Sequence, residues 1–111
     1  MEGTWASAAG RTASVYFIVS NGDGADDALV GASSSLAERV SIRAPEEVAS
    51  TTVMRAVDAV PIPAGGEVSF EPGGYDVQLR GLGARLHSGS TIELRLEFEH
   101  AGSIAVTAGV R

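Results

Sequence analysis

At 111 residues the chain is long enough for one hydrophobic core and too short for two. Its formal charge is −6, all eight basic residues are arginines, and it contains no cysteine. This balance argues against nucleic acids and anionic membrane surfaces, which need basic clusters. The lack of thiols removes disulfides, zinc–sulfur sites, iron–sulfur clusters and cysteine nucleophiles.

The sequence contains neither a membrane span nor a recognisable signal peptide. No apolar run approaches the ~18 residues of a membrane span, and Met1 to Trp5 lack the charged and apolar regions of a signal peptide. The protein is therefore either cytosolic or an exported domain whose export signal is not present in this chain. Residues 1–12 are small and polar apart from Trp5. They predict a loosely held N-terminal arm, with Trp5 as its anchor, before a single domain over residues 13–111.

Alternating apolar and polar residues predict the strands that follow. The first expected strand covers residues 14–20, with Val15, Phe17 and Val19 on one face, and ends at the turn 21–24. Further short strands are expected, separated by polar or Gly- and Pro-containing turns, over residues 28–33, 39–44, 51–56, 60–63, 67–70 and 75–79.

The clearest strand pair lies at the C-terminus. Over residues 91–99, alternate positions from Ile92 to Phe98 are apolar and the intervening positions are mostly charged. A turn with Gly102 leads into a second alternating run from Ile104 to Val110, which predicts a hairpin. Strands this short, with turns every eight to twelve residues or so, indicate an all-β sandwich or barrel.

Sequence motifs for catalysis are missing. There is no Gly-x-Ser-x-Gly elbow and no His-Glu-x-x-His, and we expect no enzyme. His87 and His100 fall in expected turns and are interpreted as surface residues. The acidic loop residues are interpreted as solvated charge, and the segment 21–26 resembles a calcium loop only faintly because it lacks the closing Glu. These acidic residues are Asp23, Asp26, Asp27, Glu46 and Glu47.

Residues 57–66 (VDAVPIPAGG) and 70–75 (FEPGGY), with the flanking SVYFIVSN at 14–21 and LVGASS at 29–34, resemble the periplasmic copper chaperone family PCuAC. The resemblance covers roughly residues 12–111. It implies a cupredoxin-like, Greek-key β-sandwich in an extracytoplasmic location, such as the periplasm or the cell exterior, by secretion or lipid anchoring. It also implies delivery of Cu(I) to a respiratory oxidase.

The metal motif of that family departs from this sequence in an informative way. The family places a His or Met, ten residues, a Met, twenty-one residues and then His-x-Met. Without a gap, the four positions fall on Arg43, Met54, Asp76 and Gln78, so only Met54 is retained. Thioether and imidazole suit the soft Cu(I) ion, whereas a guanidinium brings positive charge and a carboxylate is a hard donor. We expect an Arg43–Asp76 ion pair in place of the metal, with Gln78 as a further hydrogen-bond partner.

Two functions remain open on the sequence. The first is a non-catalytic binding or interaction module with little or no copper affinity, working beside extracytoplasmic copper-handling or respiratory oxidase assembly proteins. The second is a copper chaperone that carries Cu(I) through an altered site with Met54 as its residual metal ligand, using a histidine or ligands from a partner. The first is preferred, so no cofactor is expected.

Overall fold

The computed structural model describes residues 2–22 and 24–111, and these form ten β-strands and no helix. The strands are β1 (Glu2–Ala9), β2 (Thr12–Ser20), β3 (Asp27–Ser33), β4 (Ala37–Val48), β5 (Thr51–Ala56), β6 (Val60–Ile62), β7 (Glu67–Phe70), β8 (Asp76–Leu82), β9 (Thr91–Phe98) and β10 (Gly102–Val110). The described part of the chain therefore offers no helical segment that could cross a bilayer.

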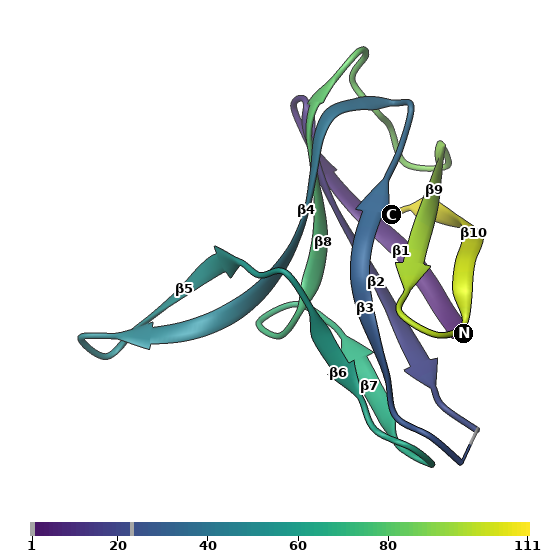
Figure 1. Ribbon diagram of the computed structural model, residues 1–111. Helices are drawn as coiled ribbons and strands as arrows, with labels where there is room; N and C mark the ends of the chain where they lie inside the picture. The colour runs from purple at the N-terminus through teal and green to yellow at the C-terminus, as the bar shows by residue number, and fades with distance from the viewer. Residues whose placement is uncertain (1, 23) are drawn as a thin grey trace.

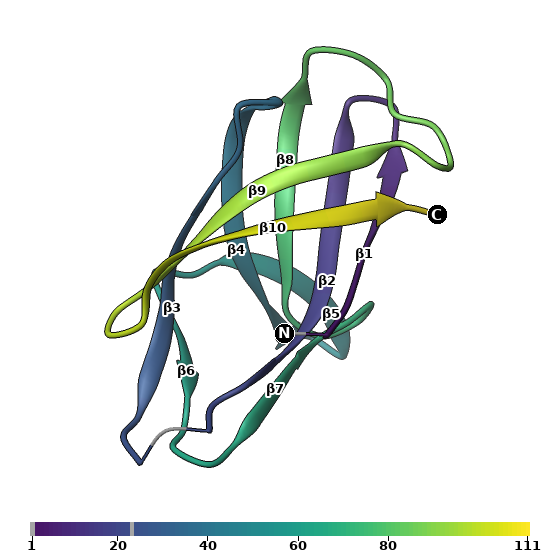
Figure 2. The ribbon, with the colours of Figure 1, turned by 90° about the vertical axis from the view of Figure 1, so that its right-hand side faces the viewer.

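All ten strands belong to one sheet that curls into two layers. The strand order is β5-β4-β8-β2-β1-β10-β9-β3-β6, with β7 added alongside β2. In Figure 2, β9 and β10 cross in front of β8, β2 and β1, so the two halves of the sheet face each other. The sheet is not closed, because β5 and β6 lie at its two ends. The expected all-β sandwich is confirmed.

Alternating apolar side chains from both layers fill the space between them. On β2 the buried positions are Val15, Phe17 and Val19, as the alternation predicted, and β9 buries every second residue from Ile92 to Phe98. Phe17 stacks on Phe70 of β7 with ring centroids 4.4 Å apart. Because successive residues of a strand point to opposite faces, the residues between these buried ones lie on the outer faces.

The N-terminal segment departs from the expected loose arm. Residues 2–9 form β1, which pairs antiparallel with β2 and parallel with β10 and so joins the two layers. Ala6 is fully buried, and Trp5 packs on Tyr16 with 4.7 Å between ring centroids. The segment has little apolar pattern of its own, and its strand structure is fixed by the neighbours on either side.

Two strands are longer than the sequence predicted. β4 continues through Pro45 to Val48 rather than ending at residue 44, and β8 runs to Leu82 rather than residue 79. Proline lacks a backbone N–H, but the alternation of the β4–β5 ladder turns the Pro45 nitrogen away from β5 and toward the β8 side of β4. Because β8 pairs with β4 only as far as Arg43, no strand on that side needs the donor. The extra length of β4 builds a β4–β5 hairpin that projects from the body of the sandwich (Figure 1).

Candidate functional site

The four positions matched to the copper motif lie on one face of neighbouring strands. Arg43 of β4 is paired with Asp76 of β8 on one side and with Ala56 of β5 on the other. Met54 is two residues from Ala56, and Gln78 is two residues from Asp76, so each shares the face of that neighbour. Residues directly opposite in an antiparallel pair also share a face. The strand register therefore brings all four positions to the outer face of β5, β4 and β8.

A bidentate ion pair occupies two of these positions. The Arg43 Nε donates to Asp76 Oδ1 at 2.8 Å, and the Arg43 Nη2 donates to Asp76 Oδ2 at 2.5 Å. The Asp76 side chain is only 5% exposed and that of Arg43 is 20% exposed. Asp76 is the buried charged residue of the described chain, and no buried side-chain nitrogen or oxygen described there lacks a partner. The ion pair expected from the sequence is confirmed.

The electrostatics of the pair keep the guanidinium charged. Donation to the Asp76 carboxylate raises the pKa of Arg43 above its ordinary value, against the opposite effect of partial burial. The negative charge of Asp76 and the neighbouring Tyr16 raise this pKa further. Arg43 therefore stays protonated, and its positive charge faces the Asp76 carboxylate.

Met54 and Gln78 stand beside the pair without joining it. Met54 lies opposite Pro45 near the middle of β5 and is partly buried. Gln78 lies opposite Ser41 on β4 and opposite Ser14 on β2. Among the described residues, no hydrogen bond links Gln78 to Arg43 or Asp76, so the expected participation of Gln78 is not seen.

The side chains at three of the four positions differ from the imidazole and thioether donors that Cu(I) prefers. Both Asp76 oxygens are taken up by Arg43, which is itself a cation, and one thioether is left as the soft donor. A metal ion bound to Asp76 would have to break the bidentate hydrogen bonds with Arg43. Such charge-assisted hydrogen bonds are among the strongest in proteins. The Arg43–Asp76 pair thus forms a polar cluster at two of the matched positions, with Met54 as the soft donor among the four.

Both histidines lie outside β4, β5 and β8, the strands that carry the four matched positions. Both are exposed, as expected for surface residues: His87 in the loop before β9, and His100 in the β9–β10 turn, where its Nε2 lies 2.9 Å from Glu99. Within residues 2–22 and 24–111, no three His, Asp or Glu side chains gather in a way that could hold a metal ion.

Two of the acidic loop residues have structural roles that the sequence interpretation missed. Asp27 accepts hydrogen bonds from the backbone N–H groups of Ala28, His100 and Ala101, so it ties the start of β3 to the β9–β10 turn. The bond from His100 is the main cause that lowers the pKa of Asp27 below 3.8. Asp26 accepts from the N–H of Ala64. Asp23 lies outside the described residues.

The acidic pair of the projecting hairpin is also held by neighbouring side chains. Glu46 forms an ion pair with Arg55 across the hairpin. Glu47 accepts a hydrogen bond of 2.5 Å from the hydroxyl of Thr52. Both residues lie in β4 and not in the expected loop, and their partners come from the β4–β5 pairing, which the local sequence does not show.

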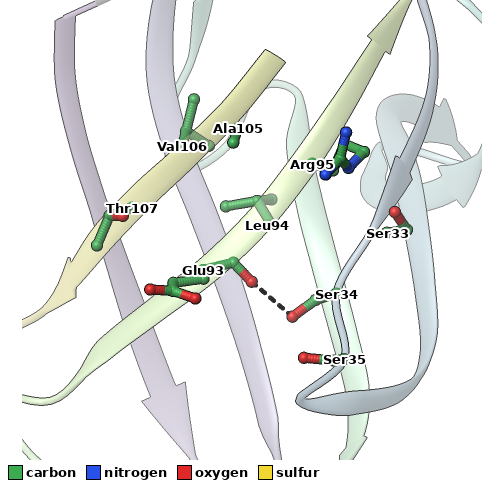
Figure 3. A pocket seen from close by; sticks show the side chains of 9 residues that line it. All are labelled: Ser33, Ser34, Ser35, Glu93, Leu94, Arg95, Ala105, Val106 and Thr107. Carbon is green, nitrogen blue, oxygen red and sulfur yellow. Dashed lines mark hydrogen bonds between the residues drawn. The ribbon is translucent and has the colours of Figure 1, made fainter. Parts of the chain in front are cut away.

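A wide surface groove lies away from the four matched positions. It is an open groove of about 660 Å³ on the other layer, where the β3–β4 connection passes beside β9 and β10 (Figure 3). The Ser34 hydroxyl closes one side by donating to the backbone carbonyl of Glu93 at 2.7 Å. Its charged side chains are Glu93 and Arg95. The groove brings no metal-ligating or nucleophilic group together with the Arg43–Asp76 pair.

Several solved structures share the fold of this chain, and they are PCuAC domains or a copper-loaded relative. The apo PCuAC domain from PmoF1 matches with a TM-score of 0.83 and 24% identity, over 99% of this chain and 90% of that one. The copper-bound PCuAC domain from PmoF2 matches with a TM-score of 0.80 and 27% identity, over 99% of this chain and 89% of that one. The solution structure of CuI-DR1885 from Deinococcus radiodurans matches with a TM-score of 0.77 and 26% identity, over 98% of this chain and 75% of that one. No curated protein matches the chain.

The fold defines a PCuAC domain, with the cupredoxin-like sandwich that the sequence resemblance implied. Within that class, residues 1–110 match the family model described as "Putative lipoprotein LpqE-like". The chain belongs to the LpqE-like family.

Proposed function

We propose that this domain is a non-catalytic, extracytoplasmic interaction module of the PCuAC class with little or no affinity for Cu(I). The observation that carries the proposal is the bidentate Arg43–Asp76 contact at two of the four positions that bear copper ligands in that class. The pair neutralises its own charge and leaves Met54 as one soft donor, so the domain keeps the scaffold of a copper carrier without its donor set.

The family supports the proposed location and partners. Its description as a lipoprotein favours a position outside the cytoplasm, on a membrane surface. The structural neighbours include copper-bound domains, which favours partners among copper-handling proteins or the assembly proteins of a respiratory oxidase. In such a setting the domain acts by binding another protein rather than by carrying the ion.

Titration with Cu(I) under reducing conditions, with a competing chelator, tests the proposal. The wild-type domain is expected to bind at best in the micromolar range, and Met54→Leu should leave this weak binding unchanged. Tight one-to-one binding that is lost in Met54→Leu would instead establish the second function, a copper chaperone with an altered site.

Restoring the missing ligands provides the positive arm of the experiment. Arg43→His/Asp76→His/Gln78→Met should create tight Cu(I) binding, because the register already places these positions on one face with Met54. Arg39→His/Arg80→His is the matched control. Arg39 and Arg80 are paired across the same two strands and on the same face, four residues along each strand from Arg43 and Asp76. This control adds two imidazoles without removing the ion pair, and it should bind much more weakly than the restored variant.

A further inference from the structure

The outer edge of β5 is a free strand edge. β5 stands at one end of the strand order and, within the described chain, pairs with β4 alone. Figure 1 shows the β4–β5 hairpin extending away from the sandwich, so the body of the domain does not cover this edge. Unpaired backbone groups along such an edge can accept another strand.

The hairpin turn determines which backbone groups face outward. Val48 and Thr51 are paired across a two-residue turn, an arrangement in which they must exchange both backbone hydrogen bonds. Hydrogen-bonded and non-hydrogen-bonded pairs then alternate along the ladder, and the bond from Val57 N–H to Ile42 O at 2.9 Å agrees with this alternation. The N–H and C=O groups of Thr52, Met54 and Ala56 therefore point away from β4.

The two edge strands of the sheet, β6 and β5, differ in the features that prevent pairing with a further strand. β6, at the opposite end, has three residues and contains Pro61, and short length and proline both discourage pairing. β5 has six residues, no proline and a regular register with β4. Its charged side chain, Arg55, is already paired with Glu46. β5 thus lacks the usual protection of an edge strand.

The composition of β5 suits pairing with itself. In an antiparallel pair about a two-fold axis at Val53 or Met54, the outward backbone groups of each copy meet those of the other. Arg55 then stands opposite Thr51 or Val53 of the second copy, so no like charges face each other. The residue on the axis, Val53 in one register or Met54 in the other, is partly buried and faces its own apolar side chain in the second copy.

We propose that the free edge of β5 docks a second copy of this chain, forming an antiparallel β5–β5 pair that continues the sheet across two domains. The proposal goes beyond the function proposed above and holds whether or not the domain binds copper. A six-residue edge is smaller than the interface of a stable dimer, and each copy carries a net charge of −6. The association is therefore weak, with a dissociation constant on the order of 0.1–1 mM, and it strengthens as salt screens the repulsion.

Sedimentation of the wild-type domain at increasing concentration and salt tests the association, with Thr52→Pro and Thr52→Ala as a matched pair. Proline removes the outward N–H of residue 52, which the β4–β5 ladder does not use. Alanine keeps that N–H but also loses the hydroxyl bond to Glu47. We expect wild type and Thr52→Ala to approach twice the monomer mass and Thr52→Pro to remain a monomer. A wild type that stays monomeric at about 1 mM, the upper end of that range, or a dimer that persists in folded Thr52→Pro, would overturn the proposal.

Cysteine cross-linking gives an independent measurement, which also covers the case in which proline disturbs the hairpin. The natural chain has no cysteine, so each single variant reports one position. Val53→Cys or Met54→Cys should form a disulfide-linked dimer under mild oxidation, because one of these residues lies on the two-fold axis in each register. Thr107→Cys, exposed on β10, is the control and should not cross-link. Equal cross-linking at all three positions would rule out a specific β5 edge.

Discussion

Both carboxylate oxygens of Asp76 accept hydrogen bonds from one side chain, the guanidinium of Arg43 on the neighbouring strand. Arg43→Met is expected to lower the free energy of unfolding by about 2–4 kcal/mol, because it leaves a buried carboxylate without its counter-charge. Asp76→Leu should cost less, since the Arg43 side chain is 20% exposed and can reach water.

A double-mutant cycle measures how much Arg43 and Asp76 stabilise each other, apart from their contacts with other residues. Arg43→Met/Asp76→Leu should be more stable than Arg43→Met alone, because it leaves no unpaired charge. Urea denaturation of the wild type and the three variants at neutral pH gives the coupling energy of the pair. Strictly additive losses would show that the two side chains do not stabilise each other.

The turn at the tip of the β4–β5 hairpin is built from unfavourable residues. Ala49 and Ser50 have φ values of 50° and 65°, a conformation that favours Asn and Gly. Ala49→Asn/Ser50→Gly should therefore stabilise the hairpin by about 1–2 kcal/mol. Amide exchange of Val48 and Val53 is the direct measurement, because the hairpin can open without unfolding the sandwich. The reversed placement, Ala49→Gly/Ser50→Asn, should give a smaller gain, and faster exchange in Ala49→Asn/Ser50→Gly would contradict the expectation.

The parts of the fold that the sequence predicted are those with a strong local pattern. The alternation in β2 and β9 marked their buried residues correctly, because those strands have one face in the core and one outside. β1 has no such pattern, and its pairing with β2 and β10 comes from tertiary contacts. The continuation of β4 past Pro45 depends on where β8 begins, at Asp76, which the local sequence around Pro45 does not encode.

The candidate site was predictable for a different reason. The spacing of Arg43, Met54 and Asp76 came from the resemblance to PCuAC, and complementary charges at two converging positions predicted their contact. Gln78 has no charge to direct it toward the pair, and the sequence had no means of excluding the hydrogen bond that the structure does not show. The bonds that Asp27 accepts were missed because their donors, His100 and Ala101, lie more than 70 residues along the chain.

Trp5 anchors β1 through contacts on both sides. It packs on Tyr16, and the guanidinium carbon of Arg111 lies 4.3 Å from the centroid of its ring. Trp5→Ala should lower the free energy of unfolding by about 2 kcal/mol, from lost apolar burial and lost ring contacts. Arg111→Ala should cost about 0.5–1 kcal/mol, the usual range for an exposed cation–π contact.

Circular dichroism in urea is the appropriate measurement for Trp5, since the chain has one tryptophan and its removal abolishes that fluorescence signal. Ser7→Ala, at an exposed position of the same strand, is the control and should change stability little. A Trp5→Ala variant as stable as the Ser7→Ala control would mean that β1 is held by its backbone pairing alone.

The carboxylate of Asp27 makes stability depend on pH in acid. Backbone N–H donors, that of His100 first, lower the pKa of Asp27 in the folded protein below 3.8, so its charged form is favoured by folding. The resulting stabilisation is fully present above the unfolded-state pKa and is lost as the pH falls through the folded-state pKa. Asp27→Asn should therefore be less stable than wild type at neutral pH, and the difference should shrink as the pH falls below 3.8.

Urea midpoints of wild type and Asp27→Asn from pH 7 down through this range provide the comparison, because the other titrating groups cancel in the difference. His100→Gln separates the two effects of that residue, since it keeps the backbone N–H that donates to Asp27 and removes the imidazole. The pH-dependent difference should survive in the His100→Gln background, because the charge of His100 is the smallest of the causes that lower the pKa of Asp27. Its disappearance there would assign the effect to the imidazole charge instead of the backbone donors.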